Sequence, residues 1–263
     1  MINYDEKIMI ETKRDYLVVK ANDLIRKSRF TLSLPEQKTI AFICSMIKPV
    51  NSTDMQTGSG YQLDYEFNIR EYCKLCGIDY NNGKNYINVK TLLKKLSDKS
   101  MYINIDNEEV LCRWLAKVRL NKKSGIVKIK LDEDLVPFLF GMGQNFTQYQ
   151  LYNILAMRSA FSIRIYELMK SYAFQRTKIF NIEELKKLLC VEDIKSYNNF
   201  KDFRKRVLEV AQKEINELTD LTIGFEPICQ GKKVVKIKCH ICQKTPIECL
   251  LARSVVGERL DVS

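Results

Sequence analysis

The chain has 263 residues, 46% of them hydrophobic, and carries 43 Lys+Arg against 32 Asp+Glu, a formal net charge of +11. This length suits one large domain or two small ones, and the basic excess favours polyanionic partners without indicating a fold. No apolar run approaches the roughly 20 residues that a membrane span needs, and the first residues hold no signal-peptide core. The nine Cys are scattered, so we expect reduced thiols and a cytoplasmic protein.

Apolar spacing in the first half predicts three helices and a hairpin. The helix over residues 34–47 has Pro35 in its first turn, where proline is favoured. After a Ser/Thr/Gly loop at 51–60, the expected elements are a strand over 61–67, helices over 68–78 and 84–100 separated by a break at 79–83, a strand over 111–120 that includes Trp114, a turn at 122–125 and a strand over 126–131.

The second half repeats this order of elements. We expect a long helix over 147–174, a strand over 178–180, a helix over 181–191 capped by Asn181, a helix over 200–217, and strands over 221–228 and 234–244 around a turn at 231–233. The two halves show no obvious residue identity, so the repeat is one of element order only.

Helix, helix–turn–helix and basic-tipped hairpin, occurring twice, predict an α+β, helix-rich fold of two tandem winged-helix domains. The first domain, residues 1–135, is expected to bind DNA and is a candidate dimerisation domain; the second, 136–244, is expected to be the main DNA-binding domain. The seam should fall near 132–146, where Pro137, Gly141 and Gly143 cluster. The tail, 245–263, is either a partner-binding helix or disordered.

Four cations stand in six residues at the start of the helix over 200–217, where the macrodipole would repel them. The buried stripe of this helix is predicted to comprise Phe203, Val207, Val210, Ala211 and Leu218, so the cations project outward. In helix–turn–helix proteins this end of the second helix enters the major groove, where Arg and Lys read guanine or hold phosphates. A solvated lysine-rich face is the alternative interpretation.

The helix over 84–100 has the same layout. Its predicted inner side carries Tyr86, Val89, Leu92, Leu93 and Leu96, and Ile87 lies among the polar residues of the outer side. Both hairpin tips are also basic. The candidate DNA-binding residues are therefore Lys84, Asn88, Thr91, Lys94, Lys95, Lys201, Arg204, Lys205, Arg206, Lys232 and Lys233.

The pairs Cys73-x-x-Cys76 and Cys239-x-x-Cys242 have a spacing that zinc sites use. We expect Cys76 and Cys239 to face the core instead, and His240 to face outward. The chain has one His and no G-x-x-x-x-G-K-[ST] loop, which excludes a two-histidine nuclease site and a P-loop ATPase. We therefore predict no catalytic residues, no metal and no cofactor; a zinc or thiol-redox protein is the minor alternative.

The run 22-NDLIRKSRFTLSLPEQK-38 resembles the opening of plasmid replication initiators of the two-winged-helix, iteron-binding family. The stretches 66-EFNIREYCKLCGI-78 and 158-RSAFSIRIYELMKSY-172 resemble two further segments of that family. The resemblance implies binding of direct repeats in a plasmid origin, opening of adjacent AT-rich DNA, recruitment of host replication proteins, dimerisation through the first domain and autorepression. A winged-helix transcriptional regulator without a replication role is the main alternative.

Overall fold

The computed structural model describes residues 4–47, 62–78, 84–105, 108–140 and 145–261. After α1 (Tyr4–Arg14), the described part of the first half forms a winged helix from the helices α3 (Leu34–Met46), α5 (Ile69–Leu75) and α6 (Lys84–Ser97) and a three-stranded antiparallel sheet of order β2-β6-β5. The strands of this sheet are β2 (Asp64–Asn68), β5 (Leu115–Leu120) and β6 (Ile126–Leu131). The first predicted winged helix is confirmed. The expected loop at 51–60 and break at 79–83 lie outside the described residues.

The single strand expected over 111–120 is wrong. The chain forms β4 (Glu108–Arg113), which pairs with β3 (Ser100–Ile105), and then a separate strand, β5, in another sheet. Between them Trp114 is fully buried, with its ring edge-on to Phe30 at 5.2 Å. The chain bends at Trp114, and the run 111-LCRWLAKVRL-120 holds no Gly or Pro that would indicate the bend.

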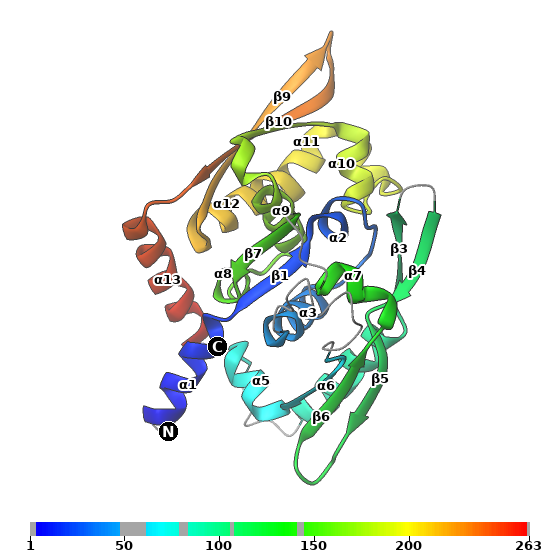
Figure 1. The fold of residues 1–263 in the computed structure, drawn as a ribbon. Coiled ribbons are helices and arrows are strands. Elements are labelled where there is room, and N and C mark those ends of the chain that lie inside the picture. Colours follow the sequence, from blue (N-terminus) through cyan, green and yellow to red (C-terminus); the bar gives the residue numbers. More distant parts are fainter. Residues whose placement is uncertain (1–3, 48–61, 79–83, 106–107, 141–144, 262–263) are drawn as a thin grey trace.

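The second half confirms the other winged helix. Helices α9 (Ala160–Ser171) and α10 (Ile182–Leu188) precede a long helical stretch, followed by the hairpin of β9 (Leu221–Gln230) and β10 (Lys233–Gln243). With β8 (Thr177–Asn181) this hairpin forms a sheet of order β8-β10-β9. Figure 1 shows the β9–β10 hairpin projecting from one end of the molecule and the β5–β6 hairpin from the other.

The two halves share residues as well as element order, which corrects the sequence analysis. Residues 67–75 and 180–188 carry the same residue at six of nine positions: Phe, Asn, Ile, Glu, Lys and Leu. Asn68 and Asn181 each cap the following helix, accepting a hydrogen bond from a backbone N–H two residues on (2.8 and 2.9 Å). The expected cap at Asn181 is thus confirmed.

Both copies also end in the same turn. Ile78 N–H donates to Cys73 O at 2.7 Å, and Val191 N–H donates to Lys186 O at 3.0 Å. The residue before each donor has a positive φ, +66° at Gly77 and +53° at Cys190. This is the Schellman arrangement, in which a left-handed residue ends a helix.

The long helix expected over 147–174 is also wrong. Its first part is the strand β7 (Phe146–Gln150), followed by the short helix α8 (Tyr152–Leu155) and then α9. Strand β7 pairs antiparallel with β1 (Leu17–Ala21), which lies near the N-terminus and far from β7 in the sequence. The spacing of apolar residues within 147–174 cannot indicate this strand, because the strand depends on pairing with β1, far away in the sequence. The domain division near 132–146 stays a prediction, and the β1–β7 pair joins its two sides.

A buried ion pair lies where β1 meets α9. Lys20 Nζ is 2.6 Å from Glu167 Oε1, and both side chains are almost fully buried. Tyr149 on β7 donates its hydroxyl to the same oxygen at 2.5 Å. Around this pair pack α2 (Asn22–Arg26) and α7 (Val136–Leu139). Removing one member of such a pair would leave a buried charge uncompensated.

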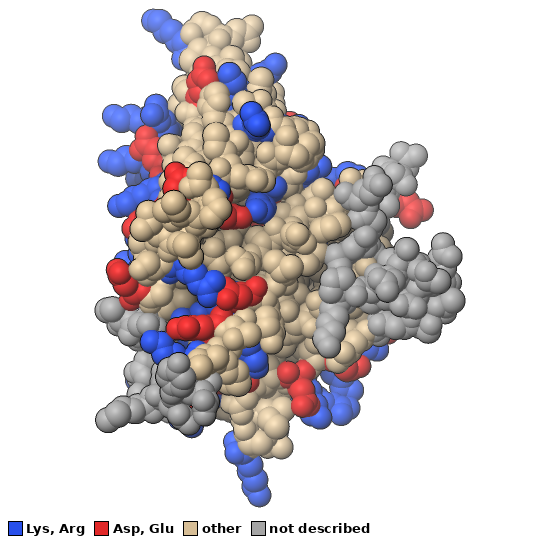
Figure 2. Space-filling view, turned by 60° about the vertical axis from the view of Figure 1, so that its left-hand side comes forward, with Lys and Arg blue, Asp and Glu red and all other residues tan. Residues whose placement is uncertain are grey.

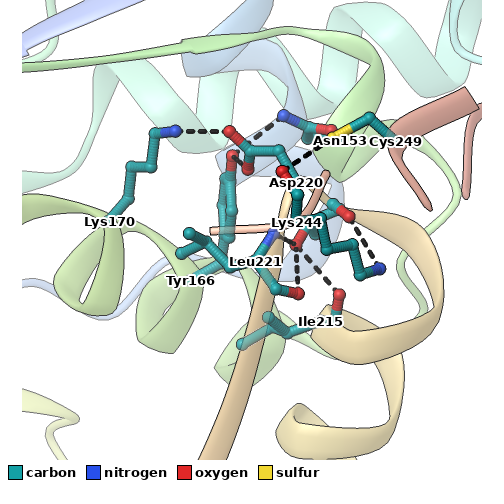
Figure 3. Close-up of polar contacts among 9 residues, drawn as sticks. Asn153, Tyr166, Lys170, Ile215, Asp220, Leu221, Lys244 and Cys249 are labelled. Carbon is teal, nitrogen blue, oxygen red and sulfur yellow. Dashed lines mark hydrogen bonds and ion pairs between the residues drawn. The ribbon is translucent and has the colours of Figure 1, made fainter. Parts of the chain in front are cut away.

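The tail is a helix, α13 (Pro246–Asp261), so its disordered alternative is wrong over these residues. Thr245 and Glu248 begin it, the carboxylate accepting from Thr245 N–H at 2.7 Å. A polar network lies around Lys244, just before α13 (Figure 3). Asp220 accepts hydrogen bonds from Tyr166 at 2.7 Å and from Lys170, and Lys244 Nζ donates to Thr219 O at 2.9 Å. Within the described part of the chain, no helix is both long and apolar enough to cross a membrane.

Candidate nucleic-acid interface

The third helix of the second winged helix is assembled from three consecutive parts. These are α11 (Phe200–Phe203), a π-helical segment (Arg204–Leu208) and α12 (Glu209–Leu218). Asn199 caps the start, its side-chain oxygen accepting from Lys201 N–H at 3.0 Å. All four predicted cations of this helix are exposed: Lys201, Arg204, Lys205 and Arg206. Their outward projection, predicted from the sequence, is confirmed.

The π-helical segment changes the face that the helix buries. Phe203, Val207, Ala211 and Leu218 are buried as predicted, but Val210 is 37% exposed and Leu208 is buried in its place. In a π-helix the hydrogen bonds run from i to i+5, so Phe203 and Leu208 share a face. An unbroken α-helical period therefore mispredicts Val210, which is a correction to the expected stripe.

Most of these cations have no acidic neighbour. Arg204 pairs with Glu209 at 2.9 Å, with both side chains about half exposed, which makes the pair weak. Lys201, Lys205 and Arg206 have no ion-pair partner among the described residues. Their charge is thus free to meet an external anion.

The β9–β10 hairpin extends the basic surface. Gly231 has φ +61° at its turn, and Lys232 and Lys233 are exposed beside it. Nearer the base, His240 Nε2 lies 2.9 Å from Glu226 Oε2, and Lys238 is 3.7 Å from the same carboxylate. The expected outward-facing His240 is thus half exposed and contacts an acid.

The corresponding helix of the first winged helix, α6, exposes all five of its predicted residues: Lys84, Asn88, Thr91, Lys94 and Lys95. Val89, Leu93 and Leu96 are buried on the opposite side, and Leu92 and Tyr86 are half-buried. Lys94 pairs with Asp98 at 2.7 Å, one turn along the helix. The predicted division of α6 into two sides is confirmed.

The sequence analysis missed cations on the β5–β6 hairpin. The strand register sets Arg119 opposite Lys128 and Lys117 opposite Lys130. Directly opposed like charges destabilise a sheet. Lys128 and Lys130 have acidic neighbours, Glu66 at 3.2 Å and Glu133 at 2.9 Å. Lys117 and Arg119 have no acidic neighbour among the described residues. That each of them faces another cation follows from the strand register, which the sequence analysis did not predict.

Positive charge therefore collects in several places and not over the whole surface. Figure 2 shows Lys and Arg side chains at the upper and lower ends of the molecule and along one upper margin, with acidic residues between them. A shallow groove beside the β5–β6 turn is lined by Arg119, Lys122, Lys123 and Lys128, among others. Figure 2 is turned about the vertical axis only, so its upper and lower ends are those from which the two hairpins project in Figure 1.

Three of the four paired cysteines, Cys73, Cys76 and Cys239, are buried core residues. Burial raises the pKa of Cys73 to about 11, and those of Cys76 and Cys239 to about 12. Cys242 is exposed on β10. No group of three or more His, Cys, Asp and Glu side chains suited to a metal ion occurs among the described residues. Thiols held protonated by burial are poor ligands and poor nucleophiles.

These features define a protein of two tandem winged helices, each with an exposed basic third helix and a basic hairpin. Comparison with known families gives the same organisation. Residues 17–170 match the family described as Initiator Replication protein, WH1, and residues 181–241 match Initiator Rep protein, WH2. The chain belongs to this family of replication initiators.

Two similar proteins accompany this assignment. The crystal structure of Pi initiator protein in complex with iteron DNA is similar with a TM-score of 0.68 and 19% identity, covering 88% of this chain and 98% of that one. At 19% sequence identity, this similarity is evidence for the fold alone. An uncharacterized 27.6 kDa protein of Escherichia coli is 20% identical over 224 residues, which is 83% of this chain and 93% of the relative.

Proposed function

We propose that this protein initiates plasmid replication by binding direct repeats in double-stranded DNA at an origin. The observation that carries the proposal is the pair of exposed basic third helices, one in each winged helix. Family membership supports it, as does the similar Pi initiator protein, whose solved complex contains iteron DNA.

In the proposed complex, α6 and the helix that begins at Phe200 enter major grooves, and the two hairpins contact phosphates. The cations at the start of the second helix then supply most of the affinity through phosphates, and a few base contacts select the site. Lys232 and Lys233 would hold the backbone beside that groove.

Further steps belong to the same proposal. The bound protein would help open adjacent DNA, recruit host replication proteins in the cytoplasm and repress its own promoter, acting without catalysis. Dimers would form through the first winged helix. The exposed cross-strand pair Tyr102 and Leu111, on the outer face of the β3–β4 hairpin, supports an apolar contact there.

DNA binding is tested by fluorescence anisotropy on duplexes taken from both sides of the coding sequence, with a shuffled duplex as control. Neutralising about six to ten phosphates predicts that log K falls with log salt at roughly −0.9 per phosphate. Arg204→Ala with Lys205→Ala should weaken binding by at least tenfold and flatten this slope.

The matched control is Lys187→Ala with Lys213→Ala, which removes two exposed cations from the same winged helix. Lys186 is unsuitable as a control because it is buried and lies near the Phe203 ring. Equal losses in the two double variants would show that total charge, and not the position of Arg204 and Lys205 near the start of the third helix, determines binding.

Replication is tested separately from binding. A plasmid that carries only the repeats and the adjacent AT-rich DNA should replicate when the protein is supplied from a second, compatible plasmid. The Arg204/Lys205 double variant should yield no transformants. Normal binding without any replication would make the protein a winged-helix regulator of transcription.

A further inference from the structure

We propose that Ile87 reads the 5-methyl group of a thymine, so that the first winged helix selects an A·T pair at one position of each repeat. This inference rests on the proposed function, because it assumes that α6 enters a major groove. It assigns a role to an apolar side chain that the described residues leave largely exposed.

Ile87 is on the polar side of α6. It is 62% exposed, whereas Val89, Leu93 and Leu96 on the opposite side are 4% exposed or less. Helical geometry sets residues three and four apart side by side. The described neighbours of Ile87 are therefore Lys84, Lys90 and Thr91, with Asn88 next along the chain, and all four are exposed.

The position along the helix also matters. Ile87 is the fourth residue of α6, which begins at Lys84. In helix–turn–helix proteins the first residues of the recognition helix contact base edges, and later residues lie farther from the bases. The helix therefore presents Ile87 and Asn88 where base edges would lie, and Lys94 and Lys95 where phosphates would lie.

The groups that each base exposes in the major groove indicate which base Ile87 would contact. Thymine alone presents a methyl group there, and an apolar side chain is its natural contact. A β-branched side chain has few rotamers to lose on binding, so Ile is well suited to a fixed contact. The amide of Asn88 can bond adenine N6 and N7 in the same groove. Together the two side chains favour an A·T pair over G·C.

The test replaces thymine by deoxyuridine one position at a time in the bound duplex, which removes the methyl group and keeps base pairing. Wild type should lose about fourfold in affinity at one position, the amount expected for one buried methyl group. Ile87→Ala should bind the thymine duplex about fourfold more weakly or worse, and lose nothing further at that deoxyuridine. Ile87→Val, which keeps a branched apolar group, should retain most of the thymine preference.

Two results would overturn the inference. One is that no single deoxyuridine weakens the wild type; the other is that the same position weakens wild type and Ile87→Ala alike. Either result leaves DNA binding, and so the proposed function, intact. If the wild type binds no repeat-bearing duplex, the proposed function fails and the inference fails with it. The thermal midpoint of Ile87→Ala should match wild type, because the side chain is largely exposed.

Discussion

Gly77 and Cys190 show how one backbone requirement is met by two residue types. Both end a helix at the same place in the repeated segment, with φ of +66° and +53°. Glycine adopts this left-handed conformation without steric cost, whereas a residue with a Cβ is strained there. The second copy of the repeat therefore carries strain that the first copy avoids.

Replacing Cys190 by glycine should relieve this strain. We expect Cys190→Gly to raise the free energy of unfolding by roughly 0.5 kcal/mol, the relief being partly offset by the greater freedom of glycine in the unfolded chain. Urea denaturation provides the measurement. Cys190→Ala is the matched control, since it removes the thiol and keeps the Cβ; an equal gain in that variant would attribute the effect to the thiol.

The helix from Phe200 to Leu218 shows what an irregular element does to an interface. Its π-helical segment contains Arg204, Lys205 and Arg206, the cations proposed to bind DNA. A π-turn shifts all later residues around the axis relative to an α-helix. That shift buries Leu208 and exposes Val210, and so sets which side chains face outward at the proposed interface.

This register predicts opposite tolerances at two apolar positions two residues apart. Leu208→Ala should lower the free energy of unfolding by about 2–5 kcal/mol, because it leaves a cavity in the core. Val210→Lys should change it by no more than about 0.5 kcal/mol, as expected for a surface position. Chemical denaturation of the two variants checks this. A large loss of stability for Val210→Lys would contradict this, because it would show that Val210 is buried, as an unbroken α-helix would place it.

At the scale of the whole molecule, the C-terminal helix contacts segments far from it in the sequence. In Figure 1 the C-terminal end of α13 lies close to the C-terminal end of α1, and Arg253 of α13 pairs with Asp15 just after α1 at 2.5 Å. Farther along α13, Arg259 pairs with Glu217 of α12. The side chain of Leu260 packs over Gly77, at the end of α5 in the first winged helix. The C-terminal helix therefore contacts both winged helices.

Gly77 tests this packing. A Cβ at this position would lie 2.9 Å from Leu260 Cδ2 and 3.1 Å from Leu260 O. Gly231 has a similar φ, +61°, but open space around it, so Gly231→Ala measures the backbone strain alone. We expect Gly77→Ala to cost about 1–3 kcal/mol more than Gly231→Ala, the usual cost of overpacking. Equal thermal shifts in both variants would show that α13 does not press on this turn.

The amino-acid pattern alone predicted three helices and a hairpin in each winged helix, the cap at Asn181, the two-sided character of α6 and the outward cations, but not the β3–β4 hairpin or β7. The predicted features depend on interactions within a few residues, such as a side chain bonding the next turn or apolar residues recurring at helical spacing. The pairing of β1 with β7, the bend at Trp114, the exposure of Val210 and the packing of Leu260 on Gly77 followed from the assembled fold. Strand pairing and packing join residues far apart along the chain, and a π-turn forms where tertiary contacts favour it, so local periodicity carries no record of them.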